Sequence, residues 1–302
     1  MTLSLRRQPQ IGIIVRNIGI SPPTKSKQNV KTEKVGLAKK YLEELIIKKT
    51  LDIIALSEVS ENESYAFKQL ATQLKMGYID LSGKIGRIII DISLIYQMNK
   101  LEFISSKFLT KLQPDNRMVR VGVAVVFKEI EHQKIITLFL SHWPSILSAN
   151  DTTREVAAAG LRSSINKLFE NNGDDVQFIC MGDYNTEPYS NAMLNILYAT
   201  RDYHLIKKKR KLLFNPFWYL LSDKKTNNLG TYYYNSASIN RWYVFDQMIF
   251  SSSFLYGKED CFKLDLEQLD FYRVLNDDNH CLDDIFFKKF DHYPIFCRIF
   301  HE

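Results

Sequence analysis

Near-continuous runs of apolar residues recur along this chain, and helical patterns separate several of them. The runs are IGIIV, DIIAL, VGVAVVF, IITLFL, VQFICM, VFDQMIF and PIFCRIF. Runs without alternating polar positions predict strands that are buried on both faces. Apolar residues at helical spacing predict two helices, around 38–46 and 157–169, and the second has a capping sequence at 151–153.

The connections between these strands indicate the fold class. The strands at 52–57 and 176–181 each follow a predicted helix. The strands at 119–127 and 135–142 are joined by the short polar link KEIEHQK, which suits a hairpin. Crossovers and hairpins in one chain predict an α/β fold in which two mixed β-sheets pack face to face with helices outside.

The domain organisation follows from what the chain lacks. No internal repeat and no Pro/Gly/Ser-rich linker divides it, so we expect one domain over 1–302. Polar stretches at 21–34 and 257–289 are predicted to be surface insertions.

Composition and charge narrow the class of protein. An apolar fraction of 45% and a charged fraction of 25% are those of an ordinary soluble protein. No apolar run suits a membrane span or a signal peptide, so we expect a cytoplasmic protein without membrane contact. The cysteines lack CxxC or zinc-type spacing, which favours reduced, mostly buried thiols; they are Cys180, Cys261, Cys281 and Cys297. A net charge of +6 suits a phosphate-bearing partner.

Polar residues stand at the C-terminal ends of the apolar runs. They are Asn17, Glu58, His142, Asp183 and Asn185. A single polar residue at a strand end is usually a cap or a turn residue. Recurrence over several strands changes that interpretation, because strand ends on one rim of a sheet are where α/β proteins place ligands.

The segment MGDYN combines a carboxylate and an amide. If the chain stays extended, the spacing of Asp183 and Asn185 puts both side chains on one face. Gly182 lets the backbone bend or approach a ligand. A carboxylate binds a metal or accepts a proton and an amide donates to a phosphoryl oxygen, so the pair is half of a candidate phosphoryl-transfer site.

Two residues near the C-terminus add a candidate base. His292 precedes the last apolar run, and its unperturbed pKa would suit a general base. Asp246 stands among apolar residues, where an unpaired carboxylate is costly, so it needs a histidine or a metal as its partner.

The blocks DIIALSEV, SHWPS, MGDYNTEP, FDQMIFS and DHYPI follow the order and approximate spacing of the endonuclease/exonuclease/phosphatase, or DNase I-like, superfamily, which this chain resembles. IIVRNIG is similar to its first strand, so the resemblance spans 11–299. LLFNPFWYLL followed by GTYYY is similar to an uncharacterised bacterial branch. The resemblance implies a four-layer sandwich of two mixed sheets with flanking helices.

The resemblance also implies a role for each matching residue. Glu58 would be the main ligand of Mg²⁺, or of Mn²⁺, with Asn17 beside it and Asp291 close to the metal. The catalytic group would contain His142, Asp183, Asn185, Asp246 and His292, with Asp246 orienting His292. A water would attack the phosphorus in line, and its proton would pass to His292 or to Asp183. This chain departs from the family at Ser57, Arg16 and Phe290, where Gln, an aromatic residue and Ser are usual.

The substrate expected from the sequence is nucleic acid, DNA or RNA, and the alternative is a small phosphorylated molecule such as a phosphodiester. An inositol phosphatase is disfavoured, because Thr186 and the block RWYVFDQ differ from the family's inositol-phosphate motifs. Arg241, Trp242 and Tyr243 are predicted to contact substrate from a loop. KKKRK at 207–211 is either a phosphate contact or a solvated loop, and Phe217 and Trp218 are expected in the core.

A third interpretation is a catalytically weakened member that binds nucleic acid or protein without cutting it. That interpretation predicts loss of the residues matching Glu58, Asp183 and His292, and all three are present.

Overall fold

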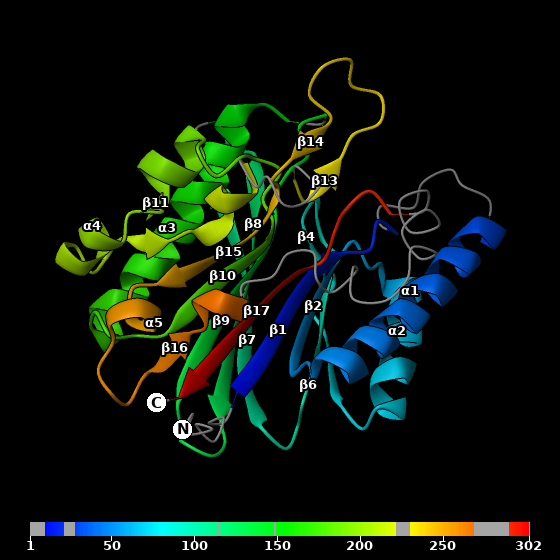
Figure 1. The fold of residues 1–302 in the computed structure, drawn as a ribbon. Helices are drawn as coiled ribbons and strands as arrows, with labels where there is room; N and C mark the ends of the chain where they lie inside the picture. Colours follow the sequence, from blue (N-terminus) through cyan, green and yellow to red (C-terminus); the bar gives the residue numbers. More distant parts are fainter. Residues whose placement is uncertain are drawn as a thin grey trace.

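The computed structural model describes residues 10–20, 28–113, 115–147, 149–221, 230–268 and 290–301. Two mixed β-sheets pack face to face, and helices cover their outer faces (Figure 1). This arrangement confirms the fold class predicted from the sequence. No helix in these ranges is long and apolar enough to cross a membrane.

One sheet has six strands in the order β16-β17-β1-β2-β6-β3. Its strands are β16 (Phe262–Leu264), β17 (Ile295–His301), β1 (Gln10–Asn17), β2 (Ile53–Ser57), β6 (Ile92–Tyr96) and β3 (Gly77–Asp80). β1 and β2 run parallel, so their C-terminal residues lie at the same edge. Helices α1 (Gln28–Lys49) and α2 (Glu61–Gln73) lie on the outer side of this sheet (Figure 1).

The other sheet has seven strands in the order β11-β12-β15-β10-β9-β8-β7. They are β11 (Ala199–Thr200), β12 (Leu213–Phe214), β15 (Asp246–Ser251), β10 (Phe178–Asp183), β9 (Ile135–His142), β8 (Met118–Glu129) and β7 (Leu101–Leu112). The antiparallel pair of β8 and β9 confirms the predicted hairpin. β9 and β10 run parallel and end together. Helix α3 (Asp151–Asn172) packs on the outer face, and the Asn150 side chain caps it by accepting from the Thr153 amide at 3.1 Å.

Two small hairpins and several short helices complete the described chain. The hairpins are β4 (Gly83–Ile85) with β5 (Ile88–Ile90), and β13 (Tyr232–Tyr233) with β14 (Trp242–Tyr243). The short helices are α4 (Tyr203–Lys208), α5 (Ser253–Tyr256), a π-helix at Ala192–Ile196 and 3₁₀ turns at Pro216–Leu221 and Leu266–Gln268. An antiparallel bridge between Tyr232 and His292 ties the β13–β14 hairpin to the segment just before β17.

The apolar core has two parts. The larger part fills the space between the two sheets and extends under α1 and α2, and the smaller part lies between the seven-stranded sheet and α3. Both parts are consistent with strands buried on both faces. The thiols of Cys180 and Cys297 are free and buried, Cys261 is partly exposed, and Cys281 lies outside the described residues.

Three local predictions need correction. Residues 28–34 form the first turns of α1 and are not a surface insertion. Within the predicted insertion 257–289, Phe262–Leu264 is an edge strand beside β17. Residues 269–289 lie outside the described residues. The strand escaped prediction because its apolar pattern is only three residues long. Phe217 is buried as expected, but Trp218 is partly exposed, with the Arg201 guanidinium 4.6 Å from its ring centroid.

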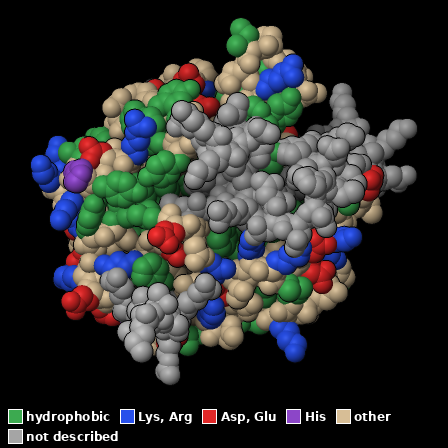
Figure 2. Space-filling model, viewed as in Figure 1, with side chains coloured by type: hydrophobic (Ala, Val, Ile, Leu, Met, Phe, Trp, Pro, Cys, Tyr) green, Lys and Arg blue, Asp and Glu red, His purple; other side chains and the backbone are tan. Residues whose placement is uncertain are grey.

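Side chains are unevenly distributed over the face of the molecule in Figure 2. Hydrophobic side chains gather between the positions of α4 and α5 in Figure 1, with basic side chains at the border of this area. Exposed apolar residues of α4 and of the 3₁₀ turn at Pro216–Leu221 are Leu205, Tyr219 and Leu221.

Candidate active site

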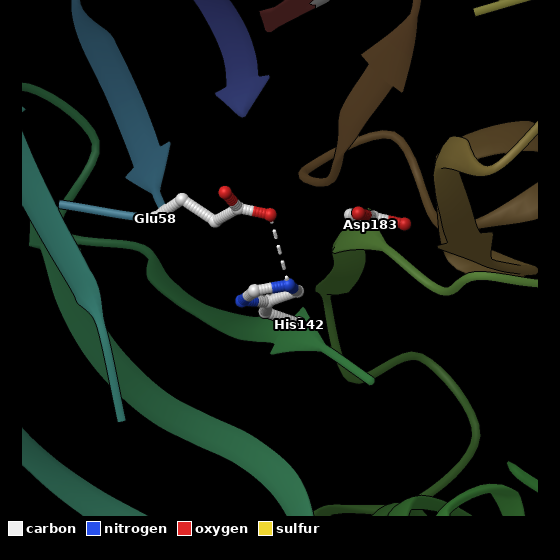
Figure 3. A group of neighbouring side chains, drawn as sticks. All are labelled: Glu58, His142 and Asp183. Atoms are coloured by element: carbon white, nitrogen blue, oxygen red, sulfur yellow. Dashed lines mark ion pairs between the residues drawn. The ribbon is translucent and has the colours of Figure 1, made fainter. Parts of the chain in front are cut away.

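Four strands that end at the same edge bring the predicted polar residues together. Asn17 ends β1, Glu58 follows β2, His142 ends β9 and Asp183 ends β10. Because each of these strands belongs to a parallel pair and the two sheets pack face to face, the four side chains converge between the sheets. Figure 3 shows Glu58, His142 and Asp183 pointing toward one another from these strand ends.

Glu58 reaches the centre from a strained backbone. Its φ is 56°, in the left-handed region that costs a side-chain-bearing residue energy. Its carbonyl accepts the Ile20 amide at 3.0 Å, and its carboxylate accepts the Asn17 amide nitrogen at 2.9 Å. Strain of this kind is retained where the surrounding structure fixes a functional side chain. Burial raises the pKa of Glu58, although the histidines at 142 and 292 oppose the shift.

Asp183 and Asn185 form a turn rather than one extended face. β10 ends at Asp183, and Asn185 has a φ of 49°. The Asn185 amide donates to Asp183 Oδ1 at 2.9 Å, and the Asn185 side chain donates to the Trp143 carbonyl at 3.2 Å. The prediction of a shared face depended on an extended chain, so it is wrong here. Gly182 serves a different purpose from the one expected, because a Cβ there would lie 1.9 Å from the Ser141 carbonyl on β9.

Asn17 joins the two carboxylates of the centre. Its Nδ2 lies 2.9 Å from Glu58 Oε1, 3.1 Å from Asp183 Oδ2 and 3.5 Å from His292 Nε2. Its Oδ1 accepts the Gly19 amide at 2.9 Å. A donor placed between two carboxylates lowers their mutual repulsion, so Asn17 holds the acidic pair in place.

His292 is bound at both ring nitrogens. Nδ1 lies 2.8 Å from Asp246 Oδ2, and Nε2 lies 3.8 Å from Asp183 Oδ2. The partner predicted for Asp246 is therefore the histidine. Burial alone would lower the pKa of His292, but the carboxylates at 246 and 183 outweigh it and raise that pKa to about 10. Burial raises the pKa of Asp246 to about 6 against the opposing effect of His292. At neutral pH the pair is therefore an ion pair.

His142 has a similar arrangement with different partners. Its Nδ1 lies 2.9 Å from Asp91 Oδ1, and its Nε2 lies 3.5 Å from Glu58 Oε1. Arg120 Nη1 contacts the same Asp91 oxygen at 3.2 Å. Burial and Arg120 lower the pKa of His142, but the carboxylates of Asp91 and Glu58 prevail and raise it.

The donor set at the centre fits a divalent cation. Ligand atoms of Glu58, His142 and Asp183 lie within 4.8 Å of one another. Two carboxylates that burial would otherwise penalise gain most from a cation between them, and oxygen ligands suit a hard metal ion. The two carboxylates would hold the metal, whose charge would stabilise phosphoryl oxygens.

Asp291, which was predicted together with Asn17 and Glu58 at the metal, is exposed and does not belong to this group of ligand atoms. A Cβ on Gly19 would lie 3.7 Å from Asp291 Oδ1 and 2.8 Å from Lys34 Nζ. Lys34, which reaches in from α1, donates to the Gly19 carbonyl at 2.8 Å. Lys34 belongs to the stretch 21–34 that was predicted to be a surface insertion, whereas it borders the loop that holds Asn17.

The predicted substrate contacts lie on the β13–β14 hairpin, not in a loop. Trp242 and Tyr243 form β14, and Arg241 donates to the Ala237 carbonyl at 3.0 Å within the same hairpin. The aromatic residue beside the catalytic group is Tyr232, whose ring centroid lies 4.6 Å from that of His292. Burial, followed by Asp291 and Asp183, raises the pKa of Tyr232.

Sequence reasoning missed three residues that support the site. Asp91 binds His142, Thr231 accepts the Asp246 amide through its hydroxyl at 2.9 Å, and Tyr232 lies against His292. A single aspartate inside the apolar run IIIDISLIY was the available signal for Asp91, by the argument already used for Asp246. The block GTYYY contained the other two.

The basic run at 207–211 lies away from the centre. Arg210 pairs with Asp175 at 3.0 Å, and Asp175 precedes β10, whose opposite end carries Asp183. The described geometry therefore gives this run no contact with the catalytic group.

The chain is similar to known proteins in sequence and in fold. The sequence model of the Endonuclease/Exonuclease/phosphatase family matches residues 23–276. No curated protein matches the chain.

Solved structures share the fold at low sequence identity. ANGEL2, a 2′,3′-cyclic phosphatase, is 13% identical over 97% of this chain and 96% of its own, with a TM-score of 0.64. TDP2 of D. rerio, solved with a single-strand DNA product, is 13% identical over 96% and 98%, with a TM-score of 0.58. The mannosyl-6-phosphatase Bt3783 of Bacteroides thetaiotaomicron is 15% identical over 96% and 99%, with a TM-score of 0.61.

Proposed function

This chain belongs to the endonuclease/exonuclease/phosphatase family, and we propose that within it the protein is a Mg²⁺-dependent nuclease that cleaves phosphodiester bonds of DNA or RNA. The observation that carries the proposal is the meeting of Glu58 and Asp183 with two histidine–aspartate pairs at one edge of the sandwich. Phosphoester hydrolysis needs cations at the phosphoryl oxygens, a group that accepts the proton of water and an aligned nucleophile.

Each of these needs has a candidate residue. His292 is protonated at neutral pH because Asp246 raises its pKa, so its Nε2–H would donate to a phosphoryl oxygen that gains charge. The Asp183 carboxylate, 3.8 Å from that nitrogen, would then accept the proton of the attacking water. Glu58 and Asp183 would hold Mg²⁺, for which Mn²⁺ is the expected substitute.

The remaining polar residues would position these groups. Asn17 holds Glu58 and Asp183 in place by donating to both carboxylates from its side-chain amide nitrogen. His142 would steady the Glu58 carboxylate and contact the phosphoryl or leaving oxygen from the other side. Asn185 would act through Asp183, because its backbone amide binds that carboxylate.

Each of the two substrate classes is supported by one protein of similar fold. TDP2 was solved with a single-strand DNA product, which supports nucleic acid. Bt3783 is a mannosyl-6-phosphatase, which supports small phosphorylated molecules as the alternative. We favour nucleic acid because aromatic rings border the catalytic group on the Tyr232 side, where they can stack on bases.

The test is hydrolysis by the purified protein with Mg²⁺ of single- and double-stranded DNA, RNA, a small phosphodiester and sugar phosphates. Asp183→Ala and His292→Ala are the matched inactive variants, and His204→Ala, an exposed histidine on α4, is the control that should retain full activity. Equal rates of hydrolysis in the wild type and in both variants would show that a contaminating enzyme hydrolyses the substrate. Activity confined to sugar phosphates would replace the nuclease with a phosphatase.

A further inference from the structure

A cleft of about 880 Å³ is continuous with the catalytic group, because Glu58 and His142 are among its lining residues. No residue of the Tyr232 hairpin lines it. Its walls are the β4–β5 hairpin, the turn between β7 and β8 and the start of α3. Its charged and apolar lining residues include Arg87, Ile89, Asp91, Arg117, Met118 and Arg120. The cleft is thus continuous with the site but built from segments to which no function has yet been assigned.

Three arginines line this cleft, and they differ in how they are held. Arg120 donates to Asp91 at 3.2 Å and to the Ile89 carbonyl at 3.0 Å, so it is fixed in the wall. Arg117 pairs with Asp115 at 2.6 Å, but both side chains are largely exposed, so solvent weakens this pair. Arg87 is exposed on the turn of the β4–β5 hairpin, and its guanidinium makes no ion pair within the described part of the chain.

Apolar side chains stand beside these arginines. Ile89 is 54% exposed and Met118 is 42% exposed, and both line the cleft. An exposed aliphatic side chain next to a guanidinium fits a ligand with an anionic group and an adjoining flat apolar surface. A nucleotide has this combination of phosphate and base.

We propose that the cleft binds the nucleic-acid strand beyond the bond that is cut, with Arg87 and Arg117 on the next phosphate and Ile89 and Met118 against its base. The inference deepens the proposed function and rests on it. Glu58 and His142 line the same cleft as the arginines, so one extended substrate can place a phosphate at the metal and another at the arginines. A substrate with a single phosphate would leave the arginines without an anion, which is why we assign a polynucleotide.

The experiment measures binding separately from cutting. In a His292→Ala background with Mg²⁺ present, the anisotropy of a labelled single-stranded oligonucleotide is titrated at several salt concentrations. The double variant Arg87→Ala/Arg117→Ala is compared with the control Lys84→Ala, an exposed lysine on β4 that does not line the cleft. We expect the double variant to bind about tenfold more weakly and the slope of log affinity against log salt to fall by about 1.4.

Each result of this experiment has one interpretation. Unchanged affinity and salt slope in the double variant, or an equal loss in Lys84→Ala, would overturn the cleft assignment. Competition by a nucleoside 3′,5′-bisphosphate that matches the oligonucleotide would assign the cleft to a small molecule with two phosphates and would also overturn it. Arginine-dependent binding by a wild type that cuts no nucleic acid would instead overturn the proposed nuclease while leaving the cleft assignment in place.

Discussion

Two histidine–aspartate pairs flank the catalytic group, and they cross the sandwich in opposite directions. His142 belongs to the seven-stranded sheet, and its partner Asp91 directly precedes β6 of the six-stranded sheet. His292 lies three residues before the start of β17 in the six-stranded sheet, and its partner Asp246 begins β15 of the seven-stranded sheet. Each pair therefore fixes one sheet against the other at the edge where the site lies.

The two pairs differ in which charged groups contact the aspartate. Asp91 shares its oxygen between His142 and the Arg120 guanidinium, so its charge is divided between two cations. Among the described residues, the ion pair of Asp246 is with His292, and no arginine or lysine shares its charge. An undivided carboxylate holds its histidine more firmly in the charged form, which agrees with a pKa of about 10 for His292. The comparison predicts unequal roles: His292 carries charge toward the substrate, and His142 steadies Glu58.

The largest expected effect is on turnover. We expect His292→Asn to lower kcat by about 10³-fold, because it removes a charged donor at the phosphoryl oxygens. His142→Asn should lower kcat by about tenfold to a hundredfold, since Glu58 stays bound to Asn17. Steady-state rates on a nucleic-acid substrate measure both, with circular dichroism as the control for folding. A greater loss in His142→Asn than in His292→Asn would reverse the assigned roles.

The next effect is on stability against pH in protein stripped of metal with a chelator. The folded pKa of His292 is raised from 6.5 to about 10, so the folded state binds more protons than the unfolded state within this range. The stabilisation is complete below the unfolded value and is lost as pH rises through the folded one. Asp246, with a pKa of about 6, is already ionised throughout and does not contribute. We expect the free energy of unfolding to fall by on the order of 4 kcal/mol across this range.

His292→Gln should flatten this dependence, and urea unfolding at several pH values measures it. The control His204→Gln changes an exposed histidine on α4 and should leave the wild-type slope intact. An equal dependence of the unfolding free energy on pH in the wild type and in His292→Gln would mean that the ion pair with Asp246 does not raise the pKa of His292.

The sequence predicted the two sheets and the convergence of their ends better than it predicted local geometry. Buried strands are recognisable in the sequence as apolar runs. A polar residue at the C-terminal end of such a run is expected at the rim of the sheet. Asn17, Glu58, His142 and Asp183 could therefore be placed at one edge from the pattern alone. The residue type of Asp183 suggested its chemistry, whereas the roles of Asn17, Glu58 and His142 came from the resemblance to a family.

Other features could not be predicted, because they depend on contacts between distant segments. Asp91 contacts His142, which is 51 positions away in the sequence. Lys34 donates to the Gly19 carbonyl, which is 15 positions away. Asn185 adopts a left-handed conformation that two-residue spacing does not encode. Periodicity gives the direction of a side chain relative to its own strand, whereas these contacts depend on how the elements pack.

The smallest expected effect tests the cause of the difference between the pairs. Arg120 lowers the pKa of His142 by sharing Asp91 with it, so Arg120→Met should raise that pKa and make the His142 pair resemble the His292 pair. Imidazole resonances followed by NMR during a pH titration would report the shift. The control is Arg117→Met, an exposed arginine bound to Asp115 rather than Asp91, which should leave the titration of His142 unchanged. A His142 pKa that stays the same or falls in Arg120→Met would show that burial, and not the shared carboxylate, separates the two histidines.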